Sequence, residues 1–379
     1  MNKILFVVNA PEFFLSHRLP LAIAASKAGF KVHIASADGA GVQKISQFGF
    51  EHHVIDIARS GQNPLKELLS IVRIFRVFQK IRPHIVHLVT IKPVLYGGLA
   101  ARLAGVDGVV AAVSGLGTVF LSQSGLAGLR KTIISFLYRQ AFRQKKLAVI
   151  FQNPDDRQVL LDIGALSFDQ SRLIRGSGVD LLDYPCLPEP EGTPVVVMAA
   201  RLLRDKGVYE YVEAVRVLRQ RGINACFRLI GAPDPGNPSS IGQSQLDAWA
   251  AEGIVELLGY RSDIAQQYAA ATIVCLPSYR EGLPKSLVEA AACGRAVVTT
   301  DVPGCRDAIE LDVSGVLVPV KNAEALADAL QRLIESPALR QGMGAAGRAL
   351  AEREFAIEKI VDAHLNIYQE LASPVERMR

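Results

Sequence analysis

The sequence contains the stretch Ala271-Thr-Ile-Val-Cys-Leu-Pro277-Ser-Tyr-Arg-Glu281-Gly-Leu-Pro284-Lys-Ser-Leu-Val-Glu289-Ala-Ala-Ala-Cys-Gly294. The apolar run Ala271–Leu276 predicts a buried strand, and a polar, turn-rich loop follows it. The apolar residues after Pro284 recur at helical spacing and stop at Gly294, which predicts a short helix. The unpaired N–H groups at the start of such a helix point toward the loop and suit a phosphate.

The two glutamates of this stretch occupy different positions. Glu281 precedes the helix, and Glu289 lies about a turn and a half into it. One carboxylate can therefore face a sugar while the other accepts hydrogen bonds from a ribose diol. Two solvated glutamates on an ordinary strand–loop–helix unit are the alternative interpretation.

Three further motifs precede this stretch along the chain. They are Ala199-Ala-Arg201-Leu-Leu-Arg-Asp-Lys206-Gly207, Leu229-Ile-Gly231 and Leu258-Gly-Tyr260-Arg-Ser-Asp263-Ile. With Glu281 and Glu289 they resemble, in order and spacing, the signature of the family 4 retaining glycosyltransferases. In that family the first motif binds phosphate, the second is a strand-end glycine and the third recognises the base. The resemblance covers roughly residues 174–354 well and the amino-terminal half more weakly.

The resemblance implies roles in donor binding. Arg201 and Lys206 would hold the donor phosphates, the arginine with a planar fork and the lysine as a point charge. Two solvated basic side chains are the alternative, and Arg204 could replace either. Glu281 would lie near the donor sugar, and Glu289 would bind the ribose hydroxyls. The resemblance also implies donor binding by the loop residues Gly282, Leu283 and Pro284. Tyr260 and Arg261 would lie near the base, with a core-closing role as the alternative for Tyr260.

Short apolar runs alternate with helical patterns along the chain, which predicts doubly wound parallel sheets. In the first half the expected strands are Ile4–Val8, Lys31–Ser36, Ile85–Val89, Val109–Val113 and Leu147–Phe151, and the expected helices are Pro20–Ala28, Leu65–Ile81, Tyr96–Ala104 and Leu129–Arg143. The proline-rich segment 182–194 predicts a linker. We expect an acceptor- and membrane-facing domain at 1–181, a nucleotide-sugar domain at 195–356, and a last stretch, 357–379, that crosses back onto the first domain. Two Rossmann-like domains facing a cleft form the GT-B architecture, which the resemblance also implies.

Composition narrows the class of protein. A chain of 379 residues predicts two or three domains, and half of its residues are hydrophobic. The apolar start predicts a first strand rather than a secretory signal. No apolar stretch reaches the ~20 residues of a membrane-spanning helix. The five cysteines lack Cys-x-x-Cys spacing, which predicts free thiols in a reducing cytoplasm rather than disulfides or zinc ligands.

Positive charge is concentrated in the first part of the chain. Residues 1–150 contain 19 Lys and Arg against 6 Asp and Glu, a net charge of +13, whereas the remainder carries −8. Two apolar segments also carry basic residues at helical spacing: Arg73, Arg76, Lys80, Arg139, Arg143, Lys145 and Lys146. This pattern predicts a surface that lies on anionic lipid, with core helices edged by solvated charges as the alternative. Nucleic acid is not expected, because no stacking aromatics are interleaved with the basic residues.

The amino-terminal half departs from the better-known family members. Its first strand runs into a loop without glycine, and where many members have a sugar-contacting histidine the sequence reads Val113-Ser-Gly115-Leu-Gly117-Thr118. The segment Phe-Leu-Ser-His17-Arg18-Leu-Pro resembles a bacterial subgroup that builds surface polysaccharides and lipid-linked oligosaccharides. The candidate acceptor-side residues are His17, Arg18, Gly115, Gly117 and Thr118. A histidine that opens a helix as a capping residue is the alternative for His17.

The expected function is retaining transfer of a hexose or N-acetylhexosamine from a UDP-sugar to a lipid-linked, undecaprenyl-diphosphate-bound saccharide. We expect no required metal or cofactor, because the basic pair supplies the charge and no carboxylates show metal-ligand spacing. The expected location is the cytoplasm, peripheral on the inner face of the membrane. A nucleotide-sugar epimerase of the same architecture and a non-catalytic sugar-nucleotide-binding subunit are the alternatives.

Overall fold

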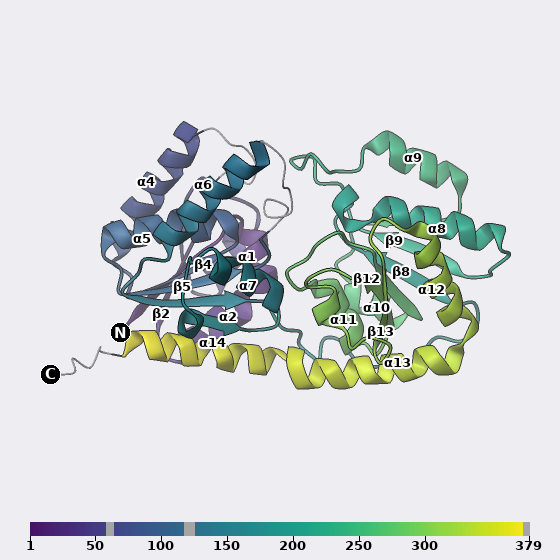
Figure 1. Ribbon diagram of the computed structural model, residues 1–379. Coiled ribbons are helices and arrows are strands. Elements are labelled where there is room, and N and C mark those ends of the chain that lie inside the picture. The colour runs from purple at the N-terminus through teal and green to yellow at the C-terminus, as the bar shows by residue number, and fades with distance from the viewer. Residues whose placement is uncertain (58–63, 117–125, 374–379) are drawn as a thin grey trace. The chain divides into compact units, whose positions relative to one another are not determined.

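A computed structural model describes residues 1–57, 64–116 and 126–373 of the chain. The chain divides into two compact units, Met1–Ser177 with Glu358–Arg379, and Gly178–Ile357. Each unit is a parallel β-sheet with helices packed on its two faces (Figure 1). The prediction of two doubly wound α/β domains is therefore confirmed.

The first unit contains a seven-stranded parallel sheet in the order β3-β2-β1-β4-β5-β6-β7. Its strands are β1 (Lys3–Val7), β2 (Lys31–Ser36), β3 (Glu51–Val54), β4 (Ile85–Val89), β5 (Gly108–Val113), β6 (Lys146–Phe151) and β7 (Ser171–Leu173). The central strands β4 and β5 are buried along their whole length, because helices cover both faces of the sheet. Such strands consist of continuous apolar runs, which made them visible in the sequence.

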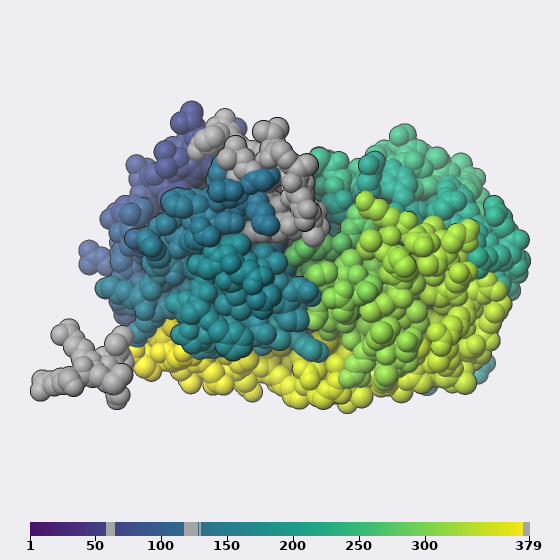
Figure 2. Space-filling view, viewed as in Figure 1, coloured from purple at the N-terminus to yellow at the C-terminus, as the bar shows by residue number. Residues whose placement is uncertain are grey.

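Two layers of helices enclose this sheet. One face is covered by α4 (Pro64–Ile81), the π-helical turn Pro93–Gly97 with α5 (Gly98–Ala104), α6 (Leu126–Ala141) and α7 (Pro154–Asp162). The other face is covered by α1 (Pro11–His17), α2 (Leu19–Lys27), α3 (Gly41–Gln47) and the carboxy-terminal helix α14 (Ile357–Ala372). Tyr368 of α14 packs edge-on against Phe6 of β1, with ring centroids 6.3 Å apart. The last helix of the chain thus completes the first unit (Figure 2).

The second unit contains a six-stranded parallel sheet in the order β10-β9-β8-β11-β12-β13. Its strands are β8 (Val195–Ala199), β9 (Cys226–Ile230), β10 (Glu256–Gly259), β11 (Ile273–Leu276), β12 (Ala296–Thr300) and β13 (Gly315–Val318). Its helices are α8 (Val208–Gln220), α9 (Gln243–Glu252), α10 (Ile264–Ala269), α11 (Lys285–Ala292), α12 (Ala323–Glu335) and α13 (Pro337–Leu350), which continues into a π-helical turn at Ala351–Phe355. The strand order reverses between β8 and β11, so the loops after these two strands diverge there.

The segment expected to be a linker packs on the second unit. Glu189 forms an ion pair with Arg340 at 2.9 Å, and both side chains are largely buried. The division between the units falls after Ser177, ahead of the expected boundary at 181, because Val179 already exchanges backbone hydrogen bonds with residues 355 and 357. Proline and lack of periodicity predicted the absence of helix and strand here, but not this attachment.

All five cysteines are free thiols, and three of them are buried. Burial raises the pKa of Cys305 to about 12, so that thiol is protonated at neutral pH. Among the described helices, none is both long and apolar enough to traverse a bilayer.

Candidate functional site

In open parallel sheets, ligands bind at the carboxyl ends of the strands, at the point where the strand order reverses. In the second unit this point lies between β8 and β11, which pair directly. Arg201 and Lys206 follow β8, and Glu281 follows β11. The sheet order therefore brings together the two motifs that the sequence singled out.

Lys206 and Glu281 form an ion pair through Nζ and Oε1, with both side chains mostly shielded from solvent. Two backbone features bring these residues together. The Asp205 carbonyl accepts hydrogen bonds from the Tyr279 amide at 2.9 Å and from the Ser278 hydroxyl. Gly207 has φ +75°, and a Cβ there would lie 2.1 Å from the Pro277 carbonyl oxygen. Only glycine permits this close approach of the two loops.

The loop that carries Glu281 is supported from the side by the turn after β12. The Glu281 amide donates to the Pro303 carbonyl at 3.3 Å. Gly304 has φ +80°, and a Cβ on it would lie 2.5 Å from the carbonyl oxygen of Gly282. Leu283 is buried beneath the loop, and Pro284 is the residue before the first turn of α11. Gly282, Leu283 and Pro284 thus form a fixed entry to the helix, as the sequence motif predicts.

Glu289 lies inside α11 and is buried, which the sequence did not predict. Its Oε1 accepts a hydrogen bond from the Tyr184 hydroxyl at 2.5 Å and lies 3.3 Å from Lys285 Nζ. Burial raises the pKa of the Glu289 carboxyl, while Lys285 and Tyr184 oppose that shift. A buried carboxylate held by two donors is not a solvated glutamate, so the alternative interpretation fails for this residue.

Arg201 is largely exposed and donates from Nη1 to Asp234 Oδ2 at 2.8 Å. Arg201 directly follows Ala200, whose carbonyl oxygen lies very close to Gly231. Gly231 has φ +144°, and a Cβ there would lie 1.8 Å from that oxygen. Arg204, the alternative phosphate ligand, lies with its guanidinium carbon 5.7 Å from the ring centre of Tyr209. The guanidinium of Arg201 is therefore accessible and that of Arg204 lies against a ring.

Tyr260 and Arg261 follow β10 at the same edge of the sheet. Tyr260 is 80% exposed, which excludes the alternative that it closes the core. Arg261 forms a two-pronged pair with Asp263, at 2.8 and 2.6 Å, which lowers the pKa of that carboxyl. An exposed tyrosine at a strand end is available to a flat ligand.

Several residues of this site had no signal in the sequence. Tyr184 comes from the proline-rich segment, and Asp234 from a loop without periodicity. Gly304 had only the turn signal of a Pro-Gly pair. Together the second-unit residues offer ammonium and guanidinium groups, the start of a helix and a buried carboxylate, which suit a diphosphate and a diol.

The first unit has a corresponding edge, where β1 and β4 pair and the strand order reverses. Asn9 after β1 donates to the Thr90 hydroxyl after β4 at 2.9 Å. Thr90 has φ +75°, a conformation that costs free energy in a β-branched residue and often marks a functional site. Gly115 after β5 has φ +113°. Neither Asn9 nor Thr90 was predicted from the sequence.

The other acceptor-side candidates have different surroundings. His17 is half-buried and stacks on Phe13, with ring centroids 4.2 Å apart. Arg18 is only 2% exposed and lies in the core layer near His87 and His364, so in this structure a ligand at the surface does not reach its guanidinium. Gly117 and Thr118 lie outside the described residues.

The basic residues expected at a membrane lie on the outer sides of α4 and α6 or just after α6. Arg73, Arg76, Lys80, Arg143 and Lys145 are exposed. Arg73 pairs with Asp56 at 3.0 Å, and Arg139 donates to the Ile163 carbonyl. Lys146 instead donates to the Leu371 carbonyl at the end of α14, so it attaches that helix to the first unit.

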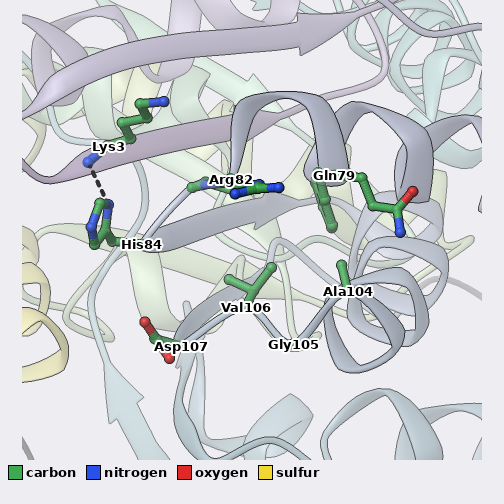
Figure 3. A pocket seen from close by; sticks show the side chains of 10 residues that line it. Lys3, Gln79, Arg82, His84, Ala104, Gly105, Val106 and Asp107 are labelled. Carbon is green, nitrogen blue, oxygen red and sulfur yellow. Dashed lines mark hydrogen bonds between the residues drawn. The ribbon is translucent and has the colours of Figure 1, made fainter.

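A separate hollow of about 870 Å³ opens at the opposite, amino-terminal edge of the first sheet (Figure 3). It is lined by residues at or just before the starts of strands, including Lys3, His84 and Asp107. The Lys3 amide donates to His84 Nδ1 at 3.0 Å across one side of it. Its position at the amino ends of the strands sets it apart from the site described above.

Family comparison agrees with the division of the chain. Residues 185–350 match the family described as "Glycosyl transferases group 1". Residues 3–153 match the family described as "Glycosyl transferase 4-like". Between them, the two matches cover most of the sequence, and each falls within one unit of the structure.

Individual relatives extend over most or all of the chain. N,N'-diacetylbacillosaminyl-diphospho-undecaprenol alpha-1,3-N-acetylgalactosaminyltransferase of Campylobacter jejuni is 28% identical, over 98% of this chain and 100% of its own. UDP-Gal:alpha-D-GlcNAc-diphosphoundecaprenol alpha-1,3-galactosyltransferase of Escherichia coli is 24% identical, over 80% of each. Among solved structures, Anabaena Alr3699/HepE in complex with UDP and glucose has a TM-score of 0.76 at 19% identity, over 97% of this chain and 100% of its own. This last likeness shows the shared fold.

Proposed function

Because the chain belongs to the group 1 glycosyltransferases, with a glycosyltransferase 4-like amino-terminal half, we propose that it transfers a hexose or N-acetylhexosamine from a UDP-sugar to an undecaprenyl-diphosphate-linked saccharide. The observation that carries the proposal is the ion pair of Lys206 with Glu281 at the strand reversal of the second sheet. The two relatives described above are named for diphospho-undecaprenol-linked sugars, which supports the acceptor class.

In the proposed donor complex the diphosphate replaces Glu281 as the partner of Lys206. Lys206 and Arg201 then offset the negative charge that grows on the leaving diphosphate as the bond to the anomeric carbon breaks. Glu281, released from the lysine, faces the hydroxyls of the donor sugar. Both contacts of Glu289 engage Oε1, so we assign Oε2 to the ribose hydroxyls.

The proposed transfer keeps the anomeric configuration. The acceptor hydroxyl attacks the anomeric carbon on the face from which the diphosphate leaves, and its proton passes to the departing phosphate oxygen. The protein's part is to position both substrates and to stabilise the diphosphate electrostatically, so no metal ion is needed for this step. The anomeric configuration of the product, measured by NMR coupling constants, tests retention directly.

We assign the acceptor to the first unit. The carboxyl ends of β1 and β4 carry the Asn9–Thr90 contact, and the strained Thr90 backbone supports a ligand site there. Since the acceptor lipid resides in a membrane, the enzyme would work in the cytoplasm, bound peripherally to the inner face of that membrane.

The membrane contact is proposed for what we call the α4–α6 surface. Both helices pack against α5 on one face of the first sheet (Figure 1). The exposed apolar side chains of this surface are Leu65, Leu68 and Leu69 of α4 and Ile133 and Phe136 of α6. Its exposed basic residues are Arg73, Arg76, Lys80, Arg130, Lys131 and Arg139. Apolar and basic groups on one surface match an anionic lipid interface.

The test is incubation of the purified protein with a panel of UDP-sugars, with and without an undecaprenyl-diphosphate-linked N-acetylhexosamine. Transfer to the lipid supports the proposal, and chelation of metals by EDTA is expected to leave the rate unchanged. Isomerisation of the nucleotide sugar without acceptor would show an epimerase instead. Binding of UDP-sugar without either reaction would show a non-catalytic subunit.

A further inference from the structure

Three potential metal ligands lie together at the edge of the first sheet. Strands β2 and β3 pair in parallel, with His33 opposite Glu51 and Ala35 opposite His53. Because side chains alternate along a strand, His33, Glu51 and His53 project from the same face. His52 projects from the other face, where its Nε2 lies 2.8 Å from the Ser36 hydroxyl.

The spacing of the ligand atoms fits a small metal ion. His33 Nδ1 lies 3.1 Å from His53 Nε2 and 3.4 Å from Glu51 Oε2, and the three atoms all lie within 4.8 Å of one another. A tetrahedral zinc ion with bonds of about 2.0–2.1 Å places its ligand atoms roughly 3.3–3.4 Å apart. The two separations from His33 Nδ1 are therefore close to those around the ion, and binding would bring the His53 and Glu51 atoms, which lie within 4.8 Å, to a similar distance.

We propose that His33, Glu51 and His53 form a zinc site with one position open to water. Two imidazoles and one carboxylate are a ligand set that zinc uses with such an open position. His33 is buried, His53 is half-buried and Glu51 is exposed, so the ion enters from the solvent side of the cluster. The bound ion joins the edge strand β3 to β2 and stabilises the fold in the manner of any ligand that binds the native state alone.

Lys31, Lys3 and Lys80 place positive charges near the ligands, and Lys31 pairs directly with Glu51. The Lys31 ammonium lies 2.6 Å from Glu51 Oε1, while Oε2 of the same carboxylate faces His33. Lys31 thus leaves the ligand oxygen in place but adds a positive charge beside it. Replacing Lys31 with an uncharged residue should therefore strengthen zinc binding, whereas the loss of any ligand should weaken it.

The test is titration of the full chain, free of any histidine tag, with ZnCl2 by calorimetry. We expect one equivalent to bind and to raise the unfolding temperature, and Co²⁺ to give the intense visible absorption of a tetrahedral ion. His53→Ala and Glu51→Gln should weaken zinc binding at least tenfold. His52→Ala is the matched control and should bind zinc as the unaltered chain does. Lys31→Met should bind more tightly and controls for the lost ion pair in Glu51→Gln.

Each contrary outcome has a definite meaning. Equal zinc affinity in His53→Ala and His52→Ala, or no stoichiometric binding in the unaltered chain, would overturn the proposal. Glu51 and His53 are less buried than His33 and tolerate substitution better. Circular dichroism of each variant checks that it folds. The readout is metal binding, so it does not depend on the transferase activity proposed above.

Discussion

Lys206 and Glu281 are 75 residues apart in the sequence and form an ion pair in the folded chain. In this ion pair the carboxylate offsets the lysine charge that we assign to the donor diphosphate. The pairing also holds the ammonium in one place before the substrate arrives, so less reorganisation is needed on binding.

We predict that Lys206→Ala lowers kcat much more than it raises KM. The diphosphate gains charge as the glycosidic bond breaks, so the ammonium stabilises the transition state more than the ground state. Loss of one such group lowers the rate on the order of 10²–10³-fold. Steady-state kinetics with varied UDP-sugar measures both constants.

Arg204→Ala is the control for Lys206→Ala. Arg204 belongs to the same turn as Lys206, but its guanidinium lies against the Tyr209 ring. The kinetics of Arg204→Ala should stay close to those of the unaltered enzyme. A larger loss in Arg204→Ala than in Lys206→Ala would transfer the phosphate role to Arg204. A higher KM with unchanged kcat would make Lys206 a ground-state anchor.

We predict that Glu289→Ala weakens UDP binding while the protein stays folded, because the ribose hydroxyls lose their acceptor. A charged acceptor contributes about 1.5–3 kcal/mol, so calorimetric titration should show a loss of roughly tenfold or more. Tyr184→Phe removes one hydrogen bond to Glu289 but keeps the carboxylate, and should have a smaller effect. Unchanged affinity for UDP in Glu289→Ala would disprove the ribose assignment.

The sequence predicted the local placement of residues that belong to one contiguous motif, since their spacing alone fixes where they lie on a strand, loop and helix. Glu281, Gly282 and Glu289 are of this kind. Tyr184 and Asp234 could not be predicted, because only the folded chain brings them to Glu289 and Arg201. Arg18 was expected on the acceptor side, but its side chain is buried, which the sequence did not reveal.

At the scale of secondary structure, glycines at two close contacts determine how the loops and helices of the second unit fit. Gly207 joins the turn after β8 to the loop after β11, and Gly344 allows α13 to approach the end of α11. A Cβ on Gly344 would lie 2.1 Å from the Gly294 carbonyl oxygen. Helix α13 was not predicted from the sequence, and its glycines lower the helix propensity of residues 337–350.

The missed elements have physical reasons. Strand β3 is short, polar and at the sheet edge, so it lacks the apolar run that revealed the central strands. Helices α1 and α3 have seven residues each, too few for a clear helical period. Elements with long apolar runs, such as β2 and β4, begin and end where the sequence predicts.

We predict that Gly207→Ala destabilises the protein and also lowers the transfer rate. Alanine in this left-handed conformation costs about 1–2 kcal/mol, and the overlap with Pro277 forces the Lys206 turn away from Glu281. Gly222→Ala is the matched control, since φ is +74° there and a Cβ meets nothing within 4 Å. Gly222→Ala should lose only the stability that alanine costs in the left-handed conformation, and its transfer rate should stay unchanged. Urea unfolding and kinetics on both variants separate the two effects.

The contact of α14 with the first sheet contains two buried histidines. His364 is buried against His87, whose Nδ1 lies 2.6 Å from the Tyr368 hydroxyl, and Arg18 lies beside them. Burial, and the charge of Arg18, lower the pKa of His364 to about 3 and also lower the pKa of His87. Both imidazoles are therefore neutral in the folded protein at mildly acidic pH.

Below pH 6.5 these two histidines bind protons in the unfolded chain but stay neutral in the folded protein. The free energy of unfolding should then fall by about 1.4 kcal/mol per pH unit for each histidine, down to about pH 3 for His364. Unfolding measured between pH 7 and 5 should show a shallower decline in His364→Gln. A decline in His364→Gln as steep as that of the unaltered chain would exclude this origin.

At the scale of the whole molecule, the excess of positive charge belongs to the first unit, where we place the acceptor. In α4, Ile74 and Phe78 face the core, so neither is available to a lipid surface. The outward stripe of α4 instead begins with Leu65, Leu68 and Leu69 and continues with basic residues. A helix with this stripe can place its leucines in the interface and its charges on the headgroups.

We predict that the protein co-sediments with vesicles rich in anionic lipid and that reversing the charges of Arg73, Arg76 and Lys80 abolishes this binding. Each basic residue near an anionic surface contributes about 1 kcal/mol, so three reversals remove more than enough to prevent binding at micromolar protein. Binding should also weaken with salt, because the Debye length shrinks to about 3 Å at 1 M. Reversal of Lys27, Lys44 and Lys359 is the control, since these exposed residues lie on α2, α3 and α14 across the sheet. Equal loss in both triple variants would indicate a response to net charge alone, and binding indifferent to lipid charge would rule out the α4–α6 surface as an electrostatic contact.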